Sequence, residues 1–103
     1  MSQNTQKVEV TQSQIDEWKK KHGDIFKITV EDKVCYLKKP SRKALGYASV
    51  AGKENPLKFN EVILKDSWLA GDDEIQTDDT LFMSVSAKLT ALIEIKDAEL
   101  EKL

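Results

Sequence analysis

The 103-residue sequence has little of what most catalytic and metal sites require. It contains one histidine, His22, and one cysteine, Cys35. Nucleophilic catalysis with a histidine base would have to use His22, which stands at the charged end of a predicted helix. A lone cysteine excludes an internal disulfide and lacks the partners of a thiolate zinc site, so we assign Cys35 to packing in a reducing compartment. We expect no enzyme and no catalytic, metal or cofactor site.

Glycine-rich loops, calcium loops and long apolar runs are also missing. The four glycines form no phosphate-binding or dinucleotide-binding pattern, and the carboxylates of residues 72–79 lack the spacing of a calcium loop. No apolar stretch approaches the roughly 20 residues that cross a bilayer, and the first residues do not form a signal peptide. We expect no contact with a membrane and a cytoplasmic location.

Neither sign of charge dominates the chain. Its 16 Lys and Arg and 18 Asp and Glu give a net charge of -2, and the two signs are interspersed. The densest basic stretch, residues 38–43, is short and contains no aromatic residue. Nucleic-acid binders usually carry a basic face, so nucleic acid is not an expected partner. With 40% apolar and 33% charged residues, the composition is that of a water-soluble globular protein.

The amino-terminal half predicts a helix followed by a β-hairpin. Residues 1–9 are polar and are predicted to form a flexible arm, with a single domain over 10–103. Thr11 and Gln14 form a capping box for a helix from about Gln12 to His22, which Gly23 ends. Apolar residues then alternate over 25–30 and recur over 34–37, after a polar turn.

Three helices are predicted after the hairpin. The first opens at Pro40 and Ser41 and stops before Gly52. The second opens at Asn55 and Pro56, is closed by Trp68 and Leu69, and ends at Gly71. An acidic connector over 71–79 leads into a final helix from about Thr80 to the carboxyl terminus.

These elements predict an α+β fold that is mostly helical. A two-stranded antiparallel hairpin is marginal alone, so we expect it to pack with about four helices. The predicted core comprises Phe26, Ile28, Val62, Ile63, Val85, Leu89 and Leu92.

The segments VCYLKKPSRKALGYA and NPLKFNEVILKDSWLAGDDEI carry a family resemblance. Over Val34 to Leu103, the order of strand, proline-started helix, helix, acidic turn and helix resembles the tail assembly chaperones of long-tailed bacteriophages and prophages. The resemblance implies a non-enzymatic protein that binds the tape measure protein and helps recruit tail tube subunits in the bacterial host cytoplasm.

Two other functions remain open at this stage. One is a minor structural protein of the phage tail. The other is a small regulatory or DNA-associated protein, but a recognition helix needs a basic exposed surface, and residues 58–68 supply only Lys58 and Lys65.

The predicted last helix is apolar around more of its circumference than a small core covers. Residues at 81–83, 93 and 95 cannot all point one way, so some are expected to meet a partner or a second copy of the chain, unless neighbouring elements enclose them all. Among the aromatics Trp18, Tyr47, Trp68 and Phe82, we expect one or two at a partner surface. The predicted partner-binding residues are Trp68, Leu69, Leu81, Leu100 and Leu103.

Overall fold

The first helix of the computed structural model, which describes residues 9–93 and 98–103, is the one that the capping box predicts. Helix α1 (Gln12–His22) begins after Thr11, whose Oγ1 accepts a hydrogen bond from Gln14 N at 3.2 Å. Gln14 Oε1 accepts one from Thr11 N at 3.1 Å, which completes the box. Gly23 ends the helix with φ 82°, in the left-handed region that favours glycine. Residues 1–8 of the predicted arm, and Ile95, lie outside the described residues.

The predicted hairpin is confirmed. Strands β1 (Ile25–Val30) and β2 (Lys33–Lys38) pair antiparallel across a two-residue turn, with Val30 opposite Lys33. Burial alternates along β2, where Cys35 and Leu37 are fully buried while Tyr36 between them is half-buried. The period of two in the sequence therefore marks the face of the sheet that meets the core.

The sheet has a third strand, and the prediction of two strands is wrong on this point. Helix α3 (Pro56–Ser67) ends at Ser67, and Trp68–Gly71 forms strand β3, which pairs antiparallel with β2. Trp68 is thus both the C-cap of α3 and the first residue of a strand, and Leu69 belongs to that strand. The sequence WLAG has no strong helix breaker before its glycine, so pairing with β2, which includes an irregularity between Tyr36 and Leu37, overrides local propensity.

Helix α2 (Arg42–Glu54) is longer than predicted because it runs through Gly52. Gly52 instead lies where α2 closely approaches Phe59 of α3. A Cβ atom at this position would lie 3.0 Å from Phe59 Cβ, closer than ordinary van der Waals contact. The chain then turns at Asn55, whose Oδ1 accepts a hydrogen bond from Leu57 N, and α3 starts at Pro56 as predicted.

The acidic connector fastens β3 and the short helix α4 (Glu74–Thr77) to β2. Asp72 makes two hydrogen bonds with Val34: its Oδ2 accepts from Val34 N at 2.8 Å, and its N donates to Val34 O at 2.9 Å. Lys33 Nζ forms an ion pair with Glu74 Oε1 at 3.2 Å, and this hydrogen bond raises the pKa of Lys33. The carboxylates at this turn therefore serve local structure.

The last helix is shorter than predicted. Helix α5 (Asp79–Leu89) is followed by one 3-10 turn, η1 (Thr90–Leu92), and the backbone of Ile93 is extended. Thr90 and Ile93 are β-branched, and such residues lower helix propensity. Residues 98–103 are exposed and have no regular secondary structure, so the predicted continuation to the terminus is wrong.

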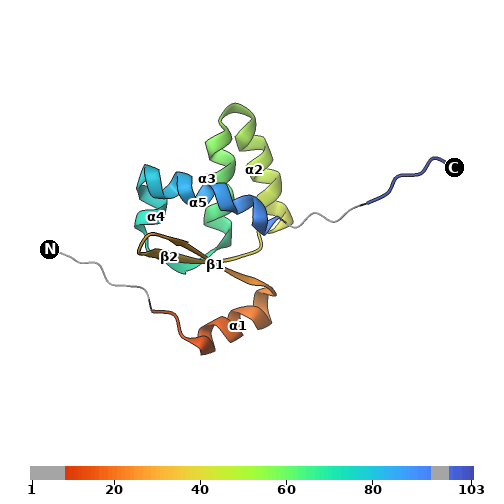
Figure 1. Cartoon of the computed structure of the whole chain (residues 1–103). Coiled ribbons are helices and arrows are strands. Elements are labelled where there is room, and N and C mark those ends of the chain that lie inside the picture. Colours follow the sequence, from red (N-terminus) through yellow and green to blue (C-terminus); the bar gives the residue numbers. More distant parts are fainter. Residues whose placement is uncertain (1–8, 94–97) are drawn as a thin grey trace.

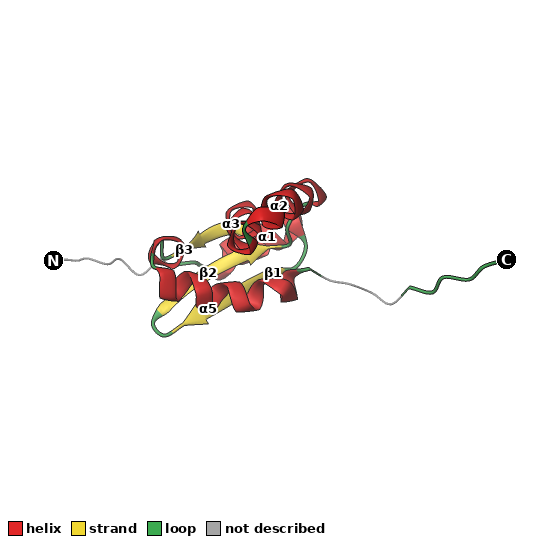
Figure 2. Cartoon of the chain, turned by 90° about the horizontal axis from the view of Figure 1, so that it is seen from above, coloured by secondary structure: helices red, strands yellow, loops and turns green. Residues whose placement is uncertain are grey.

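The elements form an α+β architecture with helices on both faces of a three-stranded sheet (Figures 1 and 2). Helices α2, α3, α4 and α5 lie on one side of the sheet, and α1 lies on the other. The described residues thus contain five α-helices where about four were predicted. The core prediction is confirmed, with Ile63, Val85, Leu89 and Leu92 buried and with Phe26, Ile28 and Val62 partly buried against them.

Candidate functional site

The predicted partner-binding residues do not form one surface on closing helices. Leu81 is only 9% exposed and belongs to the core, so its side chain is not available to a partner. Trp68 and Leu69 are half-buried in β3, and Trp68 packs against the core. Leu100 and Leu103 are fully exposed outside any helix. The expectation of one helical surface depended on helices extended to Gly71 and to the carboxyl terminus, whereas α3 ends at Ser67 and α5 at Leu89.

Exposed apolar side chains gather instead on the pair of helices α2 and α3. Within residues 9–93, the large hydrophobic side chains that are exposed are Tyr47, Val50, Leu57 and Met83. The first three belong to α2 and α3, where Tyr47 is 64% and Val50 is 68% exposed. Isolated exposed hydrophobic residues are ordinary, but three on one helical hairpin make that hairpin the candidate interaction surface.

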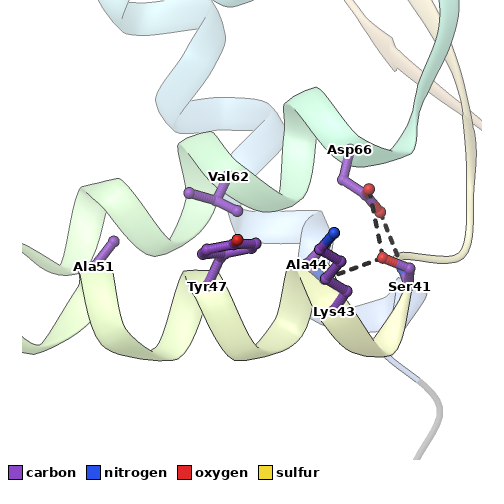
Figure 3. Close-up of a pocket in the computed structure, with 7 residues that line it drawn as sticks. All are labelled: Ser41, Lys43, Ala44, Tyr47, Ala51, Val62 and Asp66. Atoms are coloured by element: carbon purple, nitrogen blue, oxygen red, sulfur yellow. Dashed lines mark hydrogen bonds between the residues drawn. The ribbon is translucent and has the colours of Figure 1, made fainter.

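A groove of about 430 Å³ lies beside this cluster, between α2 and α3 (Figure 3). Tyr47 of α2 and Val62 of α3 face each other across it, and Ala44 and Ala51 of α2 complete its apolar lining. Small alanine side chains leave room between the two helices, while the Tyr47 ring forms an exposed wall. The groove therefore offers apolar contact area that is open to solvent.

The polar groups of the groove stand together at one end. Asp66 Oδ2 accepts a hydrogen bond from Ser41 N at 2.9 Å, Asp66 Oδ1 lies 3.5 Å from Ser41 Oγ, and Ser41 Oγ accepts from Ala44 N at 3.0 Å (Figure 3). Asp66 thus holds the start of α2, where a carboxylate is favoured by the helix dipole. Because these groups bind one another, the groove presents chiefly apolar surface and the Lys43 ammonium at its rim.

Tyr47 is one of the aromatic residues expected as an anchor, whereas the exposed position of Val50 was not predicted. The sequence nevertheless contains a signal for that position. The buried stripe of α2 is carried by Ala44 and Ala48. Val50 follows Ala48 by two residues, about 200° around a helix of 3.6 residues per turn, so it faces away from that stripe. A valine on the side of α2 opposite its buried alanines indicates that the solvent-facing side of this helix is also partly apolar.

The two groups considered for catalysis lie in different surroundings. Cys35 is fully buried, and burial raises the pKa of its thiol to about 11, which keeps it protonated. His22 is exposed at the end of α1. Over residues 9–93 and 98–103, no group of three or more His, Cys, Asp or Glu side chains is placed to hold a metal ion. None of the helices in those ranges has the length and apolar character needed to cross a membrane.

No protein-family model, curated protein or solved structure matches this chain.

Proposed function

We propose that this protein is a non-enzymatic protein-binding domain that receives a helical segment of its client in the groove between α2 and α3. The observation that carries the proposal is the exposed apolar surface of this helical hairpin, above all Tyr47, which is 64% exposed and lines the groove. Amphipathic helices dock in such grooves by inserting apolar side chains at successive turns.

The chemistry of the groove supports a protein client over a small polar ligand. Ligand sites combine an apolar lining with a few polar groups that fix orientation. Here Ser41 and Asp66 are bound to each other, and Lys43 supplies a single charge at the rim. An apolar helix with an acidic residue near Lys43 matches these features, and its binding would cover Tyr47.

The family resemblance supplies the identity of the client within this proposal. The protein acts as a tail assembly chaperone of a bacteriophage or prophage, binds the tape measure protein, and helps recruit tail tube subunits in the host cytoplasm. Such a task requires an apolar docking surface and no reactive group. The half-buried β3 residues Trp68 and Leu69 and the exposed Leu100 and Leu103 remain further candidates for contact with the client or a second copy.

The test is co-expression of the chain with fragments of the tape measure protein encoded in the same genome, followed by affinity capture. A buried aromatic anchor contributes about 2 kcal/mol or more to binding, roughly a 30-fold change in affinity. Tyr47→Asp is therefore expected to lower retention of the fragment by at least about that factor, and Val50→Asp, on the same helix but outside the groove lining, by less.

Met83→Asp is the matched control, because Met83 is 51% exposed but lies on α5, outside the groove. Circular dichroism verifies that all variants keep their helix content. Unchanged retention by the Tyr47 variant would exclude the groove as the client site. Failure of the wild type to retain any fragment would exclude the tape measure protein as the client.

A further inference from the structure

Strand β1 is an edge of the sheet, since the strand order is β1-β2-β3 and no other described strand pairs with its outer side. Figure 2 shows β1 at the margin of the sheet, with α5 crossing above it. The edge is six residues long, enough to pair with a short extended peptide.

The backbone groups that β1 directs outward follow from its register. Val30 and Lys33 close a two-residue turn, and the two residues that close such a turn exchange backbone hydrogen bonds. Every second pair of residues along the ladder from there is hydrogen-bonded in the same way. Thr29, opposite Val34, belongs to the pairs in between, which exchange no backbone hydrogen bonds. Val34 directs its own N–H and C=O to Asp72, away from β1, which fits this assignment. Ile25, Lys27 and Thr29 therefore present their backbone groups at the open edge.

A groove of about 280 Å³ lies along this edge, between β1 and the end of α5 with η1. Phe26, Ile28 and Leu92 supply its apolar lining, and all three belong to the core or pack against it. Its two charged lining residues are both cations, Lys27 and Lys88, and no carboxylate lines it. This local charge is opposite to the net charge of -2 of the whole chain.

The two lysines lie on opposite sides of the sheet, so they would flank opposite faces of a strand added to β1. Lys27 points to the face that carries Tyr36, with its Nζ 5.9 Å from the centre of the Tyr36 ring. Lys88 lies on α5, over the other face. Side chains of an added strand alternate between the two faces, so a strand in which acidic and apolar residues alternate places its carboxylates on one face, beside Lys27 when its apolar side chains lie on the α5 face. On the α5 face, apolar side chains of that strand also meet Phe26 and Ile28.

A second copy of β1 fits this edge less well. Antiparallel pairing of two β1 strands centred on Lys27 would place two ammonium groups opposite each other, and like charges in that position are destabilising. A lysine on an edge strand is also a common protection against pairing with an identical edge.

We propose that the open edge of β1 binds an extended acidic segment of a partner protein, in which Glu or Asp alternates with apolar residues, as a fourth strand of the sheet. This site is separate from the α2–α3 groove, and the inference does not rest on the proposed function.

The test titrates the full-length chain, labelled with ¹⁵N, with three synthetic octapeptides of defined sequence. The first alternates Glu and Val, and the second has Lys in place of each Glu. The third is the Glu peptide with N-methyl groups on the residues whose N–H groups pair with β1, and methylation of the alternate residues is its matched control.

The Glu peptide is expected to shift the amide signals of Ile25, Lys27 and Thr29 and to bind at least about tenfold more tightly than the Lys peptide. The double variant Lys27→Glu with Lys88→Glu is expected to reverse that preference, and both substituted residues are exposed. N-methylation on the pairing side is expected to abolish binding, while the control methylation leaves it unchanged.

Three results would overturn the proposal. Equal binding of the Glu and Lys peptides would show that the lysines do not select the occupant. Binding that survives N-methylation on the pairing side would show attraction of charge without strand addition. Sedimentation that reveals a dimer, lost on Thr29→Pro, would assign the edge to a second copy of the chain.

Discussion

The two faces of the sheet differ in how completely helices cover them. On one face, Cys35 and Leu37 of β2 are fully buried beneath helices that include α3 and α5. On the other face, Tyr36 of the same strand meets Trp18 of α1, with ring centres 6.0 Å apart, and α1 contains no fully buried residue. Alternate residues of β2 therefore pack either in the buried core or against α1, a helix with no fully buried residue.

This difference teaches that burial, and not membership of a regular element, sets the stability of each part. Helix α1 has a complete capping box and four basic residues in its last turn, so its local signals are strong. Such signals contribute about 1 kcal/mol each, whereas burying one large apolar side chain contributes roughly 1.5–3 kcal/mol. Only Ile15 and Trp18 of α1 are even partly buried. We therefore expect α1 to open independently of the core.

Thiol labelling at two adjacent positions of β2 gives the largest expected contrast between the faces. Cys35 is fully buried with a raised pKa, so native protein at pH 8 should react with a thiol reagent only when the core opens. A Tyr36→Cys variant in a Cys35→Ala background should react at least about 1,000-fold faster, since an opening of about 4 kcal/mol or more protects the first thiol. Comparable labelling rates, measured by absorbance or mass spectrometry, would refute the contrast.

Gly71 provides the second test, because it lies opposite the buried Cys35 where β3 pairs with β2. Its φ is 154°, and a Cβ atom there would lie 2.7 Å from both Cα and Cβ of Cys35. Gly71→Ala is expected to lower the free energy of unfolding by about 2–3 kcal/mol, from backbone strain and the forced displacement of β2.

Gly46→Ala is the matched control for this glycine substitution. Gly46 lies inside α2, and a Cβ atom there would have no heavy atom within 4 Å. Because alanine is the better helix former, this variant should gain about 0.5–1 kcal/mol. Urea denaturation of both variants measures the two changes, and a loss of equal size at both positions would contradict the account of Gly71.

Trp18→Ala should have the smallest effect on global stability. Removal of the Trp18 ring leaves Tyr36 without its aromatic neighbour on α1. We expect a loss of about 1 kcal/mol or less in the free energy of unfolding, together with loss of hydrogen-exchange protection over residues 12–22. Unchanged protection of the β2 amides serves as the internal control. Cooperative loss of protection in both α1 and β2 would mean that the two faces form one unit.

Local sequence signals predicted the elements that are stabilised locally. The capping box at Thr11, the alternation over β1 and β2, and the Asn55-Pro56 start of α3 each depend on a few neighbouring residues, and each is confirmed. Strand β3 escaped prediction because its pairing partner lies some thirty residues earlier in the chain, at 35–37. No pattern within WLAG records that contact.

The chemical character of the candidate site was predicted, but its place in the fold was not. An exposed apolar surface was expected, and one is present, but the expectation placed it on the closing helices because two helices were extended too far. Once Leu81 is seen to be buried, the exposed apolar residues left within residues 9–93 are chiefly those of α2 and α3. The outward position of Val50 was readable from the helical period, whereas the groove depends on how two helices pack, because its lining joins Ala44 and Tyr47 of α2 to Val62 of α3.

The position of β3 in the chain also favours an order of folding. The β1–β2 hairpin and the α2–α3 helical hairpin join neighbouring segments, and a β-hairpin forms within about 1–10 μs. Strand β3 cannot find β2 at low entropic cost until α2 and α3 have folded back on each other and drawn the ends of the intervening loop together. Formation of the α2–α3 helical hairpin, which carries the groove, thus also brings β3 to β2. A newly made chain is therefore expected to pair β3 with β2 only after the groove has formed.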